Sequence, residues 1–207
     1  INRAYEEGWV GENRLAFIGD TLSVNGEKVP ELFIVDLPLD ESGWKQPGDA
    51  PLEGTDMTMP APPSGICQRR LTFTHERAFP GLVNQPRHWV RSNPKASEIA
   101  FLMRDDNGIV QLWLISPQGG SLRQLTQCAT NIQSAFNWHP SGKWLGFVLE
   151  NRIACCDVQT GKIDFLTERH GNPPSADAIV FSPDGRQVAW MEDVEGFRQL
   201  WVTDTGR

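Results

Sequence analysis

The chain has 207 residues and a formal net charge of -7, and 39% of its residues are hydrophobic. This length suffices to bury a substantial core as one or two domains, and no apolar run approaches the roughly eighteen residues that a membrane helix needs. The acidic balance disfavours nucleic acid as a partner, because phosphate binding depends on clustered Lys and Arg.

The first predicted unit covers residues 1–72. Its opening stretch, 1–9, is short and polar, so we expect no convincing inner strand there. β-formers follow around Leu15-Ala16-Phe17 and at 32–36, and the "RRLT" segment at 69–72 predicts a closing strand. Residues 38–66 contain six prolines and four glycines, and they predict a long surface excursion between the third and fourth strands that is either disordered or folded over a neighbouring face.

Three further units repeat this pattern over 73–126, 127–167 and 168–207. Each has an apolar-small-aromatic tripeptide after a turn, and these are Ile99-Ala100-Phe101, Leu145-Gly146-Phe147 and Val188-Ala189-Trp190. An upstream strand is expected to end on an aromatic residue, at Trp89, Trp138 and Phe181 in turn, and a second strand follows each tripeptide, at 112–116, 153–157 and 200–204. Closing segments "RQLT" (123–126) and "DFLT" (164–167) end the second and third units, and the last unit lacks one.

The repeat predicts an all-β fold, a β-propeller of four-stranded antiparallel blades. The period from Trp138 to Phe181 suits a blade of about 40–50 residues, and the aromatic residues at 17, 101, 147 and 190 should pack between blades. About three and a half blades cannot close a ring of four to eight. We therefore expect a missing N-terminal portion of the same protein to complete the propeller and to supply the last blade's fourth strand.

The phrases "FSPDGRQVAW" (181–190) and "SLRQLTQ" (121–127) resemble the repeats of TolB-like β-propellers. The stretches "INRAYEEGWVG" (1–11) and "RDDNGIVQLWLISPQGG" (104–120) are similar to an uncharacterised enterobacterial family of TolB-like proteins. This resemblance implies a seven-bladed propeller, of which the chain is the C-terminal half, with no assigned activity. TolB itself works in the periplasm, whereas the unpaired cysteines favour the cytoplasm, so the compartment stays open.

Three polar linkers, at 73–88, 127–137 and 168–180, are expected to gather at the channel mouth. Binding residues favour loops held by a rigid scaffold, although channel mouths are wet and polar in any case. The candidate ligand-binding residues are His75, Arg77, Asn84, Gln85, His88, Asn131, Gln133, Arg169, His170, Ser175 and Asp177.

These residues carry no catalytic signature, which favours a non-enzymatic binding propeller that takes a protein or small-molecule partner without a cofactor. The alternative is a metal-dependent enzyme acting on acidic oligosaccharides. Gln85-x-x-His88 resembles the divalent-metal ligands of oligogalacturonate lyases, although a three-residue step in a strand points to opposite faces. Under this alternative, Arg77 and Arg169 would pair with uronate carboxylates.

Smaller motifs predict structure only. Cys67, Cys128, Cys155 and Cys156 form no CxxC pair, so buried free thiols are expected, and the adjacent Cys155 and Cys156 should point to opposite faces of a strand. The "RDDNGIVQL" segment (104–112) predicts a hairpin turn, and His139 is expected to cap its own turn.

Overall fold

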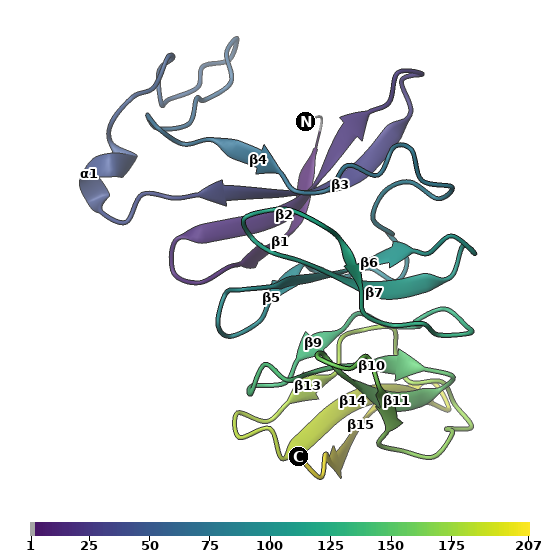
Figure 1. The fold of residues 1–207 in the computed structure, drawn as a ribbon. Helices are drawn as coiled ribbons and strands as arrows, with labels where there is room; N and C mark the ends of the chain where they lie inside the picture. Colours follow the sequence, from purple (N-terminus) through teal and green to yellow (C-terminus); the bar gives the residue numbers. More distant parts are fainter. Residues whose placement is uncertain (1–2) are drawn as a thin grey trace.

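The computed structural model describes residues 3–207. Four antiparallel sheets follow one another along the chain, and Figure 1 shows them stacked from the N-terminal to the C-terminal end of the molecule. The first sheet consists of β1 (Ala4–Trp9), β2 (Arg14–Leu22), β3 (Lys28–Asp36) and β4 (Gln68–Arg70). The second consists of β5 (Arg91–Ser92), β6 (Ile99–Arg104), β7 (Val110–Ile115) and β8 (Arg123–Gln124).

The third sheet consists of β9 (Asn137–Trp138), β10 (Trp144–Leu149), β11 (Arg152–Asp157) and β12 (Ile163–Phe165). The fourth has three strands, β13 (Val180–Phe181), β14 (Gln187–Val194) and β15 (Phe197–Asp204). The inner strands β1, β5, β9 and β13 lie next to one another in that order. The predicted all-β architecture of consecutive antiparallel units is confirmed.

Two predictions about inner strands were wrong. Residues 4–9 do form a strand, because β1 pairs with β2 from Ala4↔Gly19 to Trp9↔Leu15 across a bulge, and its backbone pairing does not need apolar side chains. Gly8 is required there, since a Cβ would lie 1.9 Å from the carbonyl oxygen of Val90. In the second sheet, Trp89 lies before the strand rather than at its end, and it is half-exposed beneath the Arg87 guanidinium.

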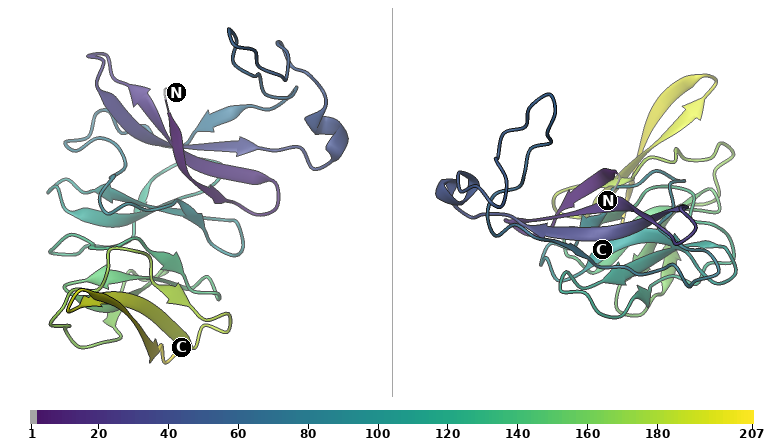
Figure 2. Two further views of the ribbon diagram at one scale, coloured as in Figure 1. Left: turned by 180° about the vertical axis from the view of Figure 1, so that it is seen from behind. Right: turned by 90° about the horizontal axis from the view of Figure 1, so that it is seen from above.

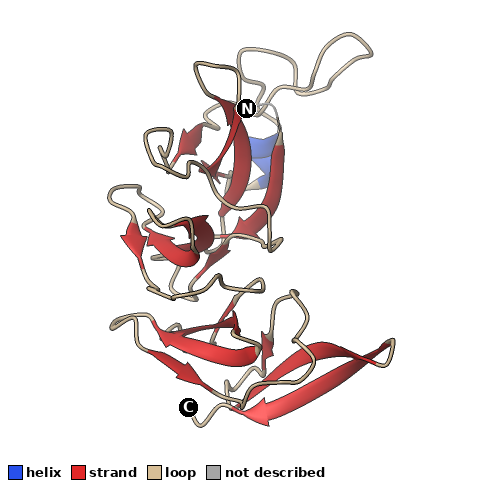
Figure 3. Ribbon diagram, turned by 90° about the vertical axis from the view of Figure 1, so that its right-hand side faces the viewer, coloured by secondary structure: helices blue, strands red, loops and turns tan. Residues whose placement is uncertain are grey.

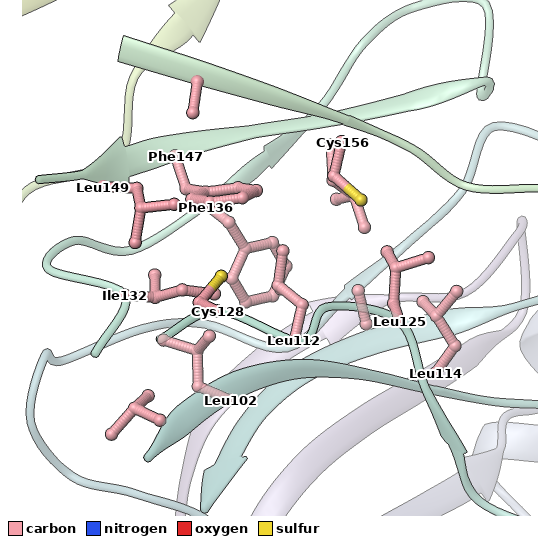
Figure 4. Packing of buried hydrophobic residues seen from close by; sticks show 14 of the residues in the cluster. Leu102, Leu112, Leu114, Leu125, Cys128, Ile132, Phe136, Phe147, Leu149 and Cys156 are labelled. Carbon is pink, nitrogen blue, oxygen red and sulfur yellow. The ribbon is translucent and has the colours of Figure 1, made fainter. Parts of the chain in front are cut away.

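Alternating side chains bury both faces of the middle sheets. In β6, Ala100 and Leu102 pack toward the third sheet, while Phe101 packs toward the first. Figure 4 shows the cluster between the second and third sheets, where Leu102 lies opposite Phe147. Trp190 likewise packs on residues of the third sheet.

The first sheet follows the same alternation, because Ala16 and Ile18 pack toward the second sheet, while Phe17 on the opposite face stacks on Phe33 of its own sheet, with ring centroids 5.7 Å apart. This pair lies on the face of the first sheet that points away from the second sheet.

The excursion contains the short helix α1 (Glu41–Trp44), and it projects away from the sheets rather than covering a face (Figures 1 and 2). The expectation of buried free thiols is confirmed for Cys128, Cys155 and Cys156 and is wrong for Cys67, which lies exposed at the end of the excursion. The other smaller predictions are confirmed. Cys155 and Cys156 belong to different core clusters, a hairpin turn joins β6 to β7, closed by the bond from Asp105 N–H to Ile109 O, and His139 Nδ1 accepts from Ser141 N–H at 3.1 Å.

Candidate functional site

The three polar linkers lie at one end of the sheets, where each contacts a neighbouring strand or hairpin. Arg77 Nη2 donates to Asp106 Oδ1 in the β6–β7 turn at 3.1 Å. Gln133 Nε2 donates to Asn151 Oδ1 in the β10–β11 turn at 3.1 Å. In the third linker, Ser175 N–H donates to the carbonyl of Met191 on β14 at 2.7 Å. Each linker is therefore fastened to its own part of the fold.

A cavity of about 860 Å³ lies between β1, the β2–β3 hairpin and the first linker. It is lined by Arg3, Tyr5, Glu6, Ile18, Asp20, Lys28, Pro30, Pro80, Leu82, Val83, Asn84, Gln85, Arg87, His88 and Arg104. We call it the β1 cavity. Its apolar residues Ile18, Leu82 and Val83 are buried, whereas its cationic residues are exposed.

Two carboxylates line the β1 cavity. The Glu6 side chain is 10% exposed, and its Oε1 accepts from Arg87 Nε at 2.6 Å. Its Oε2 is buried and has no hydrogen-bond partner among the described residues. Glu6 also has a φ of 55°, a left-handed conformation that is uncommon for a residue other than glycine.

The second carboxylate, Asp20, is buried and accepts the Tyr5 hydroxyl at 3.0 Å. Burial raises the pKa of Tyr5 to about 12, and the hydrogen bond to Asp20 adds to the shift. The phenol therefore stays protonated at neutral pH and acts as a hydrogen-bond donor to Asp20.

Cations surround these carboxylates. Arg3, Lys28, Arg87 and Arg104 are all exposed and line the β1 cavity. Four cations against two carboxylates leave the lining with two positive charges in excess, although the whole chain is acidic. Arg3 lies over the Tyr5 ring at 4.7 Å, so one side of the cavity combines an aromatic face with a cation.

His88 is a core residue. Its Nε2 accepts from Leu102 N–H at 3.1 Å, and its Nδ1 lies 3.3 Å from the carbonyl of Pro86. Burial lowers the pKa of His88 to about 4. Because both ring nitrogens are engaged while Gln85 is exposed at the cavity, the two residues do not form a shared ligand site.

No three His, Cys, Asp or Glu side chains within residues 3–207 are placed to hold a metal ion. The described part of the chain also contains no helix that is long and apolar enough to cross a membrane.

The other predicted residues lie elsewhere. Asn131, Gln133 and Arg169 share a second open cavity of about 580 Å³, where Arg169 Nη2 lies 3.5 Å from Glu150 Oε2. His170 Nδ1 lies 2.6 Å from the buried Glu192. The remainder are His75, beside Glu76 and the β2–β3 turn, Arg77, over the Trp113 ring, and Ser175, bonded to Asp177. The structure thus brings together Asn84, Gln85 and the buried His88 at the β1 cavity, and separately Asn131, Gln133 and Arg169, but it does not gather all eleven residues.

Sequence reasoning missed Arg3, Tyr5, Glu6, Asp20, Lys28 and Arg104. A usable signal was present, since Tyr5 is the chain's one tyrosine and lies in an unusually polar opening segment.

Consecutive antiparallel sheets, packed face to face with their inner strands adjacent, define a partial β-propeller. Its fold is similar to that of a putative TolB from Agrobacterium tumefaciens, with a TM-score of 0.59 and 18% identity over 99% of this chain and 59% of that one. TolB from Acinetobacter baumannii aligns with a TM-score of 0.53 and 18% identity, over 98% and 52% of the two chains. These likenesses show the fold alone.

No family model matches the chain. All 207 residues align at 72% identity with an uncharacterised protein of Escherichia coli K12, YidR. The chain spans about half of that relative's length, 49%. The resemblance to an uncharacterised group of TolB-like propeller proteins is thereby confirmed.

Proposed function

We propose that the chain is part of a non-enzymatic binding propeller, and that its β1 cavity binds a small acidic molecule carrying hydroxyl or amino groups. The observation that carries this proposal is Glu6 Oε2, a buried oxygen without a partner among the described residues, on a residue that lines the cavity. Leaving a buried acceptor unpaired costs about 1–3 kcal/mol, and more when it is charged. A ligand hydroxyl or ammonium group that donates to this oxygen removes that cost.

The cations define the other half of the ligand. Arg3, Lys28 and Arg104 are exposed at the rim and make no salt bridge within the described residues. A carboxylate or phosphate on the ligand gives these side chains an anionic partner, and Arg binds such groups with bidentate geometry. A sugar acid, with one carboxylate and several hydroxyls, matches both requirements.

The remainder of the propeller belongs to the same proposal. Since the chain matches about half of its relative, we propose that a further portion of the same protein supplies the other blades and closes the ring. The metal-dependent enzyme alternative gains no specific support, because the ring nitrogens of His88 are occupied by the core.

Isothermal titration calorimetry with gluconate and galacturonate tests the binding proposal, with glucose and galactose as uncharged controls. We expect the acids to bind more tightly than the neutral sugars. Glu6→Gln should weaken acid binding about 10-fold or more, because a hydrogen bond to a charged group is worth about 1.5–3 kcal/mol. Glu150→Gln, in the second open cavity, is the matched control and should bind as the wild type does. Equal effects of the two substitutions, or no binding of either acid, would refute the proposal.

A further inference from the structure

We infer that the chain carries a second ligand site, separate from the β1 cavity, which binds a small aromatic monocarboxylate. The site is a pocket of about 520 Å³ lined by the inner strands β1, β5 and β9 and by the residues just before β5. We call it the Arg91 pocket. Pockets for small ligands measure about 300–1,000 Å³, and this one shares no lining residue with the β1 cavity.

Arg91 is a cation inside the fold without an anionic partner. It is partly buried and makes no salt bridge within residues 3–207. Burial lowers the pKa of Arg91 below its ordinary value, because loss of water disfavours the charged form. A desolvated cation without a counter-charge is costly. A carboxylate that accepts two parallel hydrogen bonds from the guanidinium removes this cost.

Indole rings lie beside this cation. Trp89 is half-exposed, and Val90, which separates it from Arg91, packs toward the first sheet. Trp138 Nε1 donates to the carbonyl of Arg91 at 2.9 Å, which holds the second indole next to β5. The Arg87 guanidinium lies 4.9 Å from the centre of the Trp89 ring and adds positive charge next to the pocket. A planar aromatic group stacks favourably on such rings.

The binding groups lie between two sheets that both have neighbours. Arg91 pairs with Ala100, and Trp138 pairs with Leu145. Ala100 and Leu145 belong to the core between the second and third sheets, so Arg91 and Trp138 lie on the two faces that meet there. The side view of Figure 3 shows the sheets one below another between the labelled termini. The position of the pair is therefore set by sheets within residues 3–207.

The rest of the lining offers little to a hydroxylated ligand. In the β1 cavity, Glu6 Oε2 is a buried acceptor without a partner, but no lining side chain of the Arg91 pocket has such an atom within the described residues. The Asn137 amide is already engaged, because Nδ2 donates to Ile179 O at 3.3 Å and Oδ1 accepts Trp138 N–H at 3.1 Å. One anionic group on an apolar ring fits this lining, whereas a sugar acid gains nothing from its hydroxyls.

Glu7 limits the ligand to a single anionic group. This exposed carboxylate lines the same pocket and makes no salt bridge within the described part of the chain. It repels an anion in the pocket, while Arg91 attracts one. Two substitutions in one pocket should therefore change the affinity in opposite directions.

Calorimetric titration of the chain with three compounds at neutral pH tests the inference. They are 2-naphthoate, 2-naphthalenemethanol, which has the same rings without the charge, and cyclohexanecarboxylate, which has the charge without an aromatic ring. We expect 2-naphthoate to bind about 10-fold more tightly than the alcohol, because hydrogen bonds between charged groups are lost in the alcohol. It should bind about 3-fold more tightly than cyclohexanecarboxylate, because stacking is lost.

Variants then assign the binding to the pocket. Arg91→Gln should weaken 2-naphthoate binding about 10-fold and leave the binding of the alcohol unchanged. Arg186→Gln is the matched control, since it removes the same charge from a side chain that is 81% exposed in a turn of the fourth sheet, and it should bind as the wild type does. Glu7→Gln should strengthen 2-naphthoate binding about 2-fold. The Tm of each variant verifies that it folds.

NMR of the ¹⁵N-labelled wild type locates the ligand without any substitution. Addition of 2-naphthoate should shift the Arg91 Nε–H and the Trp89 indole N–H, and should leave the Trp113 indole N–H, which donates to Met103 O in the core, in place. Excess gluconate should not displace 2-naphthoate, because the two cavities have separate linings.

Four results would each overturn the inference: no binding of 2-naphthoate, equal affinity for the acid and the alcohol, an Arg91→Gln variant that binds the acid as the wild type does, or shifts at Trp113 in place of Trp89. Displacement by gluconate would show one common site and would also overturn it. If Arg91→Gln does not fold, the comparison of compounds and the shifts of the wild type still decide. The titration of the β1 cavity with sugar acids is scored separately, so either site can fail alone.

Discussion

Replacing Thr126 with Val tests whether the Thr126 hydroxyl, which accepts Leu112 N–H at 2.9 Å and donates to Gln111 Oε1 at 2.8 Å, stabilises the folded chain. The two side chains have nearly the same volume, so packing changes little, but Leu112 N–H loses its acceptor in a fully buried site. An unpaired buried N–H costs about 1–3 kcal/mol, and the lost bond to Gln111 adds about 1 kcal/mol. Gln111 Oε1 keeps its bond from Cys128 N–H at 3.0 Å, which limits the loss.

The expected decrease in the free energy of unfolding is about 2–4 kcal/mol, measured by urea denaturation. For a chain of this length it corresponds to a Tm lowered by roughly 5–10 °C in calorimetry. Thr126→Ser is the matched control, because it keeps the hydroxyl and loses one methyl group, worth about 1 kcal/mol. If the Val variant is as stable as the Ser variant, the two hydrogen bonds of the Thr126 hydroxyl do not stabilise the fold.

Three further predictions concern the core. In the folded wild type the pKa of His88 is lowered to about 4, so the free energy of unfolding is highest above pH 6.5 and falls by about 3 kcal/mol on acidification to pH 4. His88→Gln removes this titrating group and should make the free energy of unfolding less dependent on pH in this range. Equal pH slopes of the two proteins in urea titrations would contradict this. Gly146→Ala should lower the free energy of unfolding by about 1–3 kcal/mol, since its Cβ would lie 2.4 Å from Ile179 Cδ1. Gly171→Ala is the control and should be neutral, because a Cβ at that position meets open space. Similar Tm values for the two variants would be inconsistent with the packing of the third and fourth sheets. Thiol titration of the native chain should modify the exposed Cys67 rapidly and the three buried cysteines only after unfolding, and rapid reaction of all four would show that the core is open.

Most of the fold could be predicted from the sequence because each sheet repeats the same short strand and turn segments. The Leu-Thr segments predicted closing strands since their leucines fill the core and their threonines bond the neighbouring strand, and Leu71 and Leu125 are indeed buried. β1 was missed because it is held by backbone pairing to β2, and periodicity detects buried apolar faces only.

The site was less predictable, because its residues meet through register rather than through spacing. Tyr5 and Asp20 meet only because β1 and β2 pair across a bulge, and a bulge has no reliable sequence mark. The polar linkers were correctly seen as polar, but each is tied to its own hairpin, as Gln133 is to Asn151. Their side chains therefore divide among separate cavities.

The groups that accept the hydroxyls of Thr72, Thr126 and Thr167 also vary from sheet to sheet. Glu31 and Gln111 precede the residue whose N–H donates to the threonine, whereas His170 comes from a linker. The repeated Leu-Thr segment therefore predicts the threonine in each sheet, but it does not predict which side chain accepts the threonine hydroxyl.

A crystal structure of the chain soaked with gluconate would show directly whether the β1 cavity binds a sugar acid. We expect the acid in the β1 cavity, with a hydroxyl within hydrogen-bond distance of Glu6 Oε2 and the carboxylate against Arg3, Lys28 or Arg104. A ligand bound elsewhere, or a Glu6 Oε2 that already accepts a bond from the protein's own atoms in the ligand-free crystal, would contradict it.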